Sequence, residues 1–194
     1  AVSLYANDVL VYLRNVKSGL SPLLDLLHCF GQFSGLRLNT SKSCVFPLTE
    51  LGAGAMANWI GPEIPLATEA FKYLGIRVHR SLAATRADNL DRAVTGLHAS
   101  AEFWARLPLS PMGRLALAKM VALPRLLYFF SNIPVFLSRR FFKTLDSWLV
   151  QLIWGNSRCR AALSTISMPL SSGRLATPDY EAYYLASQLQ WLMP

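Results

Sequence analysis

Apolar and polar residues alternate at the start of the chain, a pattern typical of a β-hairpin. Val2, Leu4 and residues 9–13 are apolar or aromatic, as in short strands. Asn7 and Asp8 stand between the two runs, and both residue types favour a tight turn. The sequence therefore predicts a hairpin that presents polar side chains, one of them a carboxylate, at its tip.

A helical period replaces the alternation after this hairpin. Ser21 and Pro22 suit the first positions of a helix, and the apolar residues that follow them form a wide face. Gly35 suits the left-handed end of that helix. Strand patterns then return over residues 36–46 and 71–78, with a short helix and loops predicted between them.

The second half of the chain has a mainly helical pattern. From about residue 85, apolar residues recur three and four positions apart, until Pro108 and Pro111 interrupt them. Pro124 is expected to bend the following helix or to end it early. The elements predicted here are helices over residues 85–104, 111–130, 138–154 and 178–192 and a strand over residues 162–170.

The predicted helix over residues 138–154 has two chemically distinct faces. At about 100° per residue, Arg139, Arg140 and Lys143 cluster on one side. A basic stripe with an apolar back suits contact with a phosphate backbone, although a merely solvated basic face has the same pattern. The apolar residues of the other side are Phe142, Leu145, Leu149, Leu152 and Ile153.

Composition and charge favour a folded protein with an anionic partner. Apolar residues make up 53% of the 194 residues and charged residues 15%, which excludes a disordered chain. No uncharged run reaches the ~18 residues that span a bilayer, so no membrane partner is expected. The net charge of +8 is concentrated in residues 103–178, where Asp146 is the only acid. This asymmetry favours nucleic acid, and a solvated basic surface without a partner is the alternative.

Several short segments occur in the order and at the spacing of one polymerase family. They are Tyr5–Asp8 (YAND), residues 33–43 (FSGLRLNTSKS), 71–76 (FKYLGI), 152–155 (LIWG), 173–175 (GRL) and 178–189. Together they make the chain resemble the reverse transcriptase of LINE-type, non-LTR retrotransposons over nearly its whole length. The chain departs from the Tyr-Xaa-Asp-Asp signature of that family at Asn7, which replaces the first Asp.

The resemblance implies an α+β fold in which a partial antiparallel palm sheet is followed by a helical thumb. Residues 1–80 would form the C-terminal part of the palm, with a catalytic-type hairpin, a helix and primer-grip-like strands. Residues 81–155 would form the thumb, and residues 156–194 would begin a C-terminal extension. The implied partners are an RNA template, a DNA primer and the missing N-terminal part of the same polyprotein, in the nucleus or cytoplasm.

The resemblance also assigns roles to particular residues. Asp8 and the position of Asn7 would serve Mg²⁺, and Lys42 would act as an acid toward the leaving pyrophosphate. Tyr5 would lie near the primer end. Taken by itself, Lys42 is equally well an exposed lysine beside a turn. Primer or template contacts are implied for Phe71, Lys72, Tyr73, Gly75, Arg139, Arg140 and Lys143; Phe71 alone is at least as well explained by inward packing.

We expect this chain by itself to be inactive as a polymerase and to bind Mg²⁺ poorly. Asn7 offers one neutral oxygen, and the other metal-binding Asp and the fingers of the family would precede residue 1. The polymerase interpretation requires that the Asn7–Asp8 tip face a groove walled by the basic helices. The alternatives are a non-catalytic nucleic-acid-binding module, a decayed relic of a retrotransposon, and an unrelated helical interaction protein.

Overall fold

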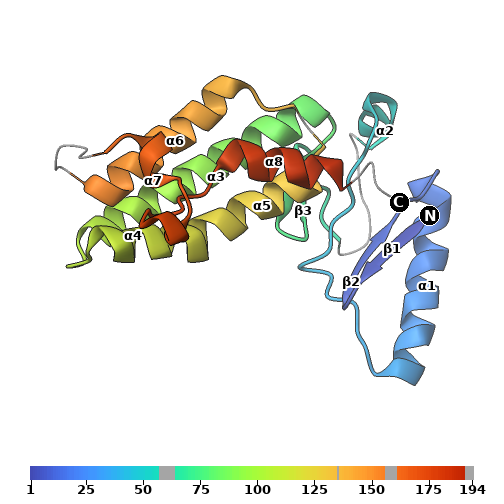
Figure 1. Cartoon of the computed structure of the whole chain (residues 1–194). Helices are drawn as coiled ribbons and strands as arrows, with labels where there is room; N and C mark the ends of the chain where they lie inside the picture. Colours follow the sequence, from blue (N-terminus) through green and yellow to red (C-terminus); the bar gives the residue numbers. More distant parts are fainter. Residues whose placement is uncertain (57–63, 135, 156–160, 191–194) are drawn as a thin grey trace. The chain divides into compact units, whose positions relative to one another are not determined.

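The chain has an α+β fold made of two compact units, Ala1–Phe71 and Lys72–Pro194. The computed structural model describes residues 1–56, 64–134, 136–155 and 161–190. Helices predominate, and the strands of the described residues form two small two-stranded antiparallel sheets (Figure 1). The predicted α+β class is therefore confirmed, while the assignment of its parts to a palm and a thumb and the boundaries at residues 80 and 155 stay predictions.

The predicted N-terminal hairpin is present, but its turn lies one residue earlier than predicted, at Ala6–Asn7 in place of Asn7–Asp8. Strands β1 (Val2–Tyr5) and β2 (Asp8–Val11) pair antiparallel, with Tyr5 opposite Asp8. This register leaves Ala6 and Asn7 as a two-residue turn. Ala6 has a φ of +51°, a left-handed conformation that a side chain makes unfavourable and that reverses the chain tightly.

Helix α1 (Val16–Ser34) begins earlier than predicted and ends where predicted. The Asn15 side chain accepts hydrogen bonds from the backbone N–H groups of Lys17 and Ser18, so this residue, not Ser21, is the N-cap. Pro22 consequently lies inside the helix. Gly35 ends it with a φ of +72°, as its lack of a Cβ allows.

The predicted strand over residues 36–46 is wrong. Asn39 organises a turn instead, because its side chain accepts hydrogen bonds from the Ser41 hydroxyl and the Lys42 backbone N–H. Only Val45 joins a bridge, with Leu66. The predicted short helix is α2 (Glu50–Ala55).

The strand predicted over residues 71–78 is a hairpin of two strands, β3 (Ala70–Tyr73) and β4 (Ile76–His79). Leu74 and Gly75 form the turn, with φ values of +47° and +85°. Positive φ at both central residues is the geometry that fits a two-residue hairpin. The glycine inside the apparent strand was thus a turn residue.

The other regular elements of the described residues are helical. The elements are α3 (Leu82–Ala105), α4 (Pro111–Leu117), a π-helical turn η1 (Ala118–Ala122), α5 (Leu123–Asn132), α6 (Arg139–Trp154), α7 (Leu163–Ile166), a 3₁₀ turn η2 (Leu170–Ser172) and α8 (Tyr180–Leu189). Helices α3, α6 and α8 confirm predicted helices within the described residues. The strand predicted over 162–170 is wrong, because the Ala162 carbonyl accepts the N–H groups of Thr165 and Ile166 and starts α7.

The predicted helix over residues 111–130 continues past Pro124 because a π-helical turn lies directly before this proline. In this turn the Leu123 N–H bonds to the carbonyl of Ala118, five residues earlier. The wider turn accommodates the proline ring and its missing N–H, which an α-helical turn would not. Pro111 opens α4 as predicted, and the Ser110 side chain caps it through the Gly113 N–H.

The core of the second unit lies between α3, α4, α5, α6 and α8. The predicted apolar face of α6 is buried in it, from Phe142 to Ile153. Phe130, Phe142 and Tyr184 pack as an aromatic cluster with ring centroids 5.3 to 6.3 Å apart. None of the helices in the described parts of the chain is long and apolar enough to cross a membrane.

Candidate nucleic-acid interface

The tip of the N-terminal hairpin presents the residues assigned to catalysis by resemblance. Tyr5, Asn7 and Asp8 are exposed there, and Tyr5 and Asp8 face each other across the two-residue turn. Lys42 is exposed in the turn organised by Asn39. The predicted groove between this tip and the basic helices stays a prediction.

The chemistry of the tip falls short of a magnesium site. Asp8 supplies one carboxylate and Asn7 one neutral amide oxygen, whereas Mg²⁺ requires hard, mostly anionic oxygen ligands. Within the described residues, no three His, Cys, Asp or Glu side chains lie together as metal ligands would. The residues present therefore do not fit the metal that the resemblance implies, and no catalytic step follows from them.

The residues of the predicted primer grip have different environments. The Phe71 ring packs against Phe46, with ring centroids 4.9 Å apart. Lys72 and Gly75 are exposed, and Tyr73 is partly buried. Lys72 is thus a side chain of β3 that presents a positive charge to solvent.

Side chains of helix α3 form hydrogen bonds with the backbone of strand β4, as a neighbouring strand would. The Asn89 side chain accepts from the Arg77 N–H at 2.9 Å and donates to the Arg77 carbonyl at 2.7 Å. The Thr85 hydroxyl accepts from the His79 N–H at 2.9 Å. At the turn, the Tyr128 hydroxyl donates to the Leu74 carbonyl. The hairpin is thereby fixed to the helical unit.

A charged cluster reinforces the same contact. Asp88 accepts from His79 Nε2 at 2.9 Å, and Arg77 Nη1 lies 3.5 Å from the same carboxylate oxygen. The hydrogen bond from His79, together with the charge of Arg77, lowers the pKa of Asp88 although desolvation opposes the shift. This cluster is a structural contact between β4 and α3, since its groups are satisfied by one another.

One hydrogen bond brings the N-terminal ends of α3 and α6 together. Arg86, one turn into α3, donates from Nη1 to the Phe136 carbonyl at 3.1 Å. Phe136 precedes Arg139, the first residue of α6, by only three positions. Arg86 therefore lies beside the basic stripe that the sequence predicts on α6.

These two helix ends have an unbalanced positive charge. Within the described residues, neither Ser81 nor Ser138 caps its helix through its side chain, and neither first turn contains an acidic residue. The helix dipole places partial positive charge at both ends. Arg86, Arg139, Arg140 and Lys143, the basic surface, are all exposed, and none of them forms a salt bridge in the described part of the chain. Backbone N–H groups and cations in this arrangement bind phosphate oxygens.

The sequence pattern missed Arg86, a member of the basic surface, and its hydrogen-bond partner Phe136. Arg86 falls on another helix, and Phe136 falls in the connection before α6, so neither belongs to the periodic stripe. Phe136 is 91% exposed, an unusual value for an aromatic side chain. The available signal was an aromatic residue close to an arginine pair, although nothing in the sequence placed Arg86 beside it.

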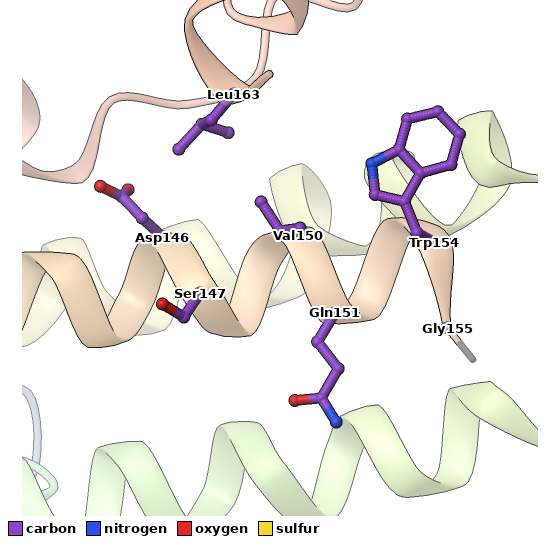
Figure 2. A pocket seen from close by; sticks show the side chains of 7 residues that line it. All are labelled: Asp146, Ser147, Val150, Gln151, Trp154, Gly155 and Leu163. Atoms are coloured by element: carbon purple, nitrogen blue, oxygen red, sulfur yellow. The ribbon is translucent and has the colours of Figure 1, made fainter. Parts of the chain in front are cut away.

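A hollow that contains one carboxylate, that of Asp146, lies further along α6. Asp146, Val150 and Trp154 of α6 line a cavity of about 460 Å³ that Leu163 covers from the other side (Figure 2). Burial raises the pKa of Asp146, and the nearby charges of Asp179 and Glu181 raise it further.

The sequence was also compared with models of known protein families, and none of them matches it.

Proposed function

We propose that the helical unit binds the phosphate backbone of a nucleic-acid duplex, and that the chain is the palm and thumb part of a retrotransposon reverse transcriptase without catalytic activity of its own. The single observation that carries the binding proposal is the Arg86–Phe136 hydrogen bond. This bond places basic side chains of α3 and α6 at the N-terminal ends of the two helices. The first turn of neither helix contains an acidic residue.

The magnitude of the expected effect follows from counterion release. Each phosphate neutralised by Arg or Lys contributes about 0.9 to the slope of log affinity against log salt. The basic surface offers Arg86, Arg139, Arg140 and Lys143, and Arg86 has already used one N–H group within the protein. Binding through this surface should therefore weaken steeply as salt is raised.

The experiment compares two double variants with the same change in net charge. The chain is titrated with a fluorescent RNA/DNA hybrid at several salt concentrations. Arg139→Ala/Arg140→Ala should weaken binding and reduce the salt slope by about 2. Arg106→Ala/Arg174→Ala removes two exposed arginines elsewhere in the unit and should change the slope by less than half as much. Equal losses in the two variants would show that only net charge matters.

The proposed origin from a reverse transcriptase rests on the order and spacing of the sequence segments that begin with Tyr5–Asp8. The proposed lack of activity rests on the oxygen ligands that Asn7 and Asp8 offer at the hairpin tip. The purified chain should add no labelled nucleotide to a primed RNA template, with or without Mg²⁺. Incorporation above that of a heat-denatured control would contradict this. In a complete enzyme of this family that carries Asn at the position of Asn7, restoring Asp should raise the rate, since it supplies the missing anionic ligand.

A further inference from the structure

A second cavity lies between helices α3, α4 and α6. Its volume is about 190 Å³, and it is lined by Arg114 of α4 together with residues from the C-terminal halves of α3 and α6. The basic surface belongs to the N-terminal ends of those two helices, so the cavity is a separate place in the fold. A water molecule occupies about 30 Å³ in the liquid, so the cavity has room for a ligand of roughly six heavy atoms.

Two buried N–H groups of the residues that line this cavity have no acceptor. Arg114 Nε and Trp148 Nε1 are both buried, and neither has a hydrogen-bond partner in the described part of the chain. The Trp148 side chain belongs to the core and is only 4% exposed. Because buried polar groups are nearly always paired, two unpaired donors from different helices at one cavity point to a ligand with acceptor oxygens.

Arg114 also brings a positive charge that no neighbour neutralises. Among the described residues it forms no salt bridge, not even with Glu102, an exposed residue that lines the same cavity. The charged end of the side chain reaches the cavity, because Arg114 Nη1 lies only 2.7 Å from where a Cβ on Gly155, another lining residue, would stand. An anionic ligand would therefore meet a cation as well as two N–H donors.

We infer that this cavity binds a small carboxylate with a short apolar chain. The guanidinium of Arg114 presents paired N–H groups that match the two oxygens of a carboxylate, and Trp148 Nε1 donates to one of them. Ala101 and Leu152 supply apolar surface for the rest of the ligand. One positive charge, with Glu102 nearby, favours a monoanion over a phosphate with two charges. The inference does not depend on the proposed nucleic-acid binding.

The test follows the indole N–H signals of the isotopically labelled chain by NMR during a titration with sodium propionate. Sodium chloride at equal ionic strength is the control, and Trp148→Phe and Trp154→Phe assign the two signals. We expect a saturable downfield shift of the Trp148 signal, with a dissociation constant on the order of 1 mM because so small a ligand makes few contacts. The Trp154 N–H is also buried and unpaired but lines the cavity of Figure 2, and it should not shift.

Three variants test the assigned contacts. Arg114→Lys keeps the charge but loses the paired donors, and should weaken propionate binding by roughly tenfold or more. Arg106→Lys makes the same change at an exposed arginine outside the cavity, and should leave the affinity unchanged. Glu102→Gln removes a negative charge from the lining and should tighten binding severalfold.

The outcomes decide the inference without reference to nucleic acid. A Trp148 signal that moves no further in propionate than in chloride would overturn it, as would an equal shift of the Trp154 signal. Tighter binding of phosphate than of propionate, or unchanged affinity in Arg114→Lys, would contradict the carboxylate assignment. If Arg114→Lys loses the wild-type circular dichroism spectrum, Glu102→Gln decides, and a failure to tighten binding there counts against the inference.

Discussion

The clearest energetic prediction concerns Asn89, the side chain that joins α3 to β4. It is 1% exposed and makes hydrogen bonds to the Arg77 N–H, the Arg77 carbonyl and the Thr85 carbonyl. In Asn89→Ala the two Arg77 groups lose their partners. A hydrogen bond contributes about 1 kcal/mol net, and an unpaired buried group adds to the loss. We therefore expect the free energy of unfolding to fall by about 2 to 3 kcal/mol.

Two measurements check this expectation. Urea unfolding followed by circular dichroism gives the change in stability, with an unchanged m-value as the sign that the denatured state is unaltered. Amide hydrogen exchange at Arg77 should lose protection, because its N–H is bonded to Asn89. The control is Asn132→Ala, an exposed asparagine whose side chain donates only to the Tyr128 carbonyl within its own helix. It should change stability by less than about 0.5 kcal/mol.

The reasoning is refuted if Asn89→Ala unfolds at the same urea concentration as the wild-type chain and Arg77 stays protected. Such a result would mean that water or a neighbouring group replaces the asparagine at no cost. A smaller loss in Asn89→Ala than in Asn132→Ala would refute it as well, because hydrogen bonds of the buried Asn89 side chain must outweigh the exposed one of Asn132.

Other perturbations have equally definite expected results. Gly155→Ala should destabilise the chain by about 1 to 3 kcal/mol, because φ is +59°, a left-handed conformation that a side chain makes unfavourable. Gly96→Ala in α3, where a Cβ meets nothing within 4 Å, should instead stabilise by about 0.5 to 1 kcal/mol in thermal unfolding. The pKa of Asp88 lies below its ordinary value of 3.8. The ionised Asp88 therefore adds to the free energy of unfolding above that pH, and this stabilisation is lost as the pH falls through the lowered pKa. Asp88→Asn should therefore flatten the acid limb of a stability–pH curve, and an unchanged limb would contradict the assignment. The pKa of Asp146 is raised, so the carboxylate destabilises the fold at neutral pH, and Asp146→Asn should raise the urea midpoint there but not in acid.

The sequence alone determined the elements that depend on local signals. Gly35 and Pro111 mark a helix end and a helix start, because a left-handed φ and a missing N–H are properties of the residues themselves. The apolar face of α6 follows from its period, since the residues that a helix aligns must be buried together. The N-terminal hairpin was recognisable for the same reason, with its turn residues between two short runs of strand formers.

Tertiary structure decided the features that depend on distant partners. The alternation in residues 36–46 makes a strand only when another strand lies beside it, and the Asn39 turn forms there instead. Arg86 and Phe136 are fifty positions apart, and only the packing of α3 near the start of α6 brings them into contact. The charge of the candidate interface could be read from the sequence, whereas its position could not, because a helical period relates residues within one helix and gives no information about which helix ends meet.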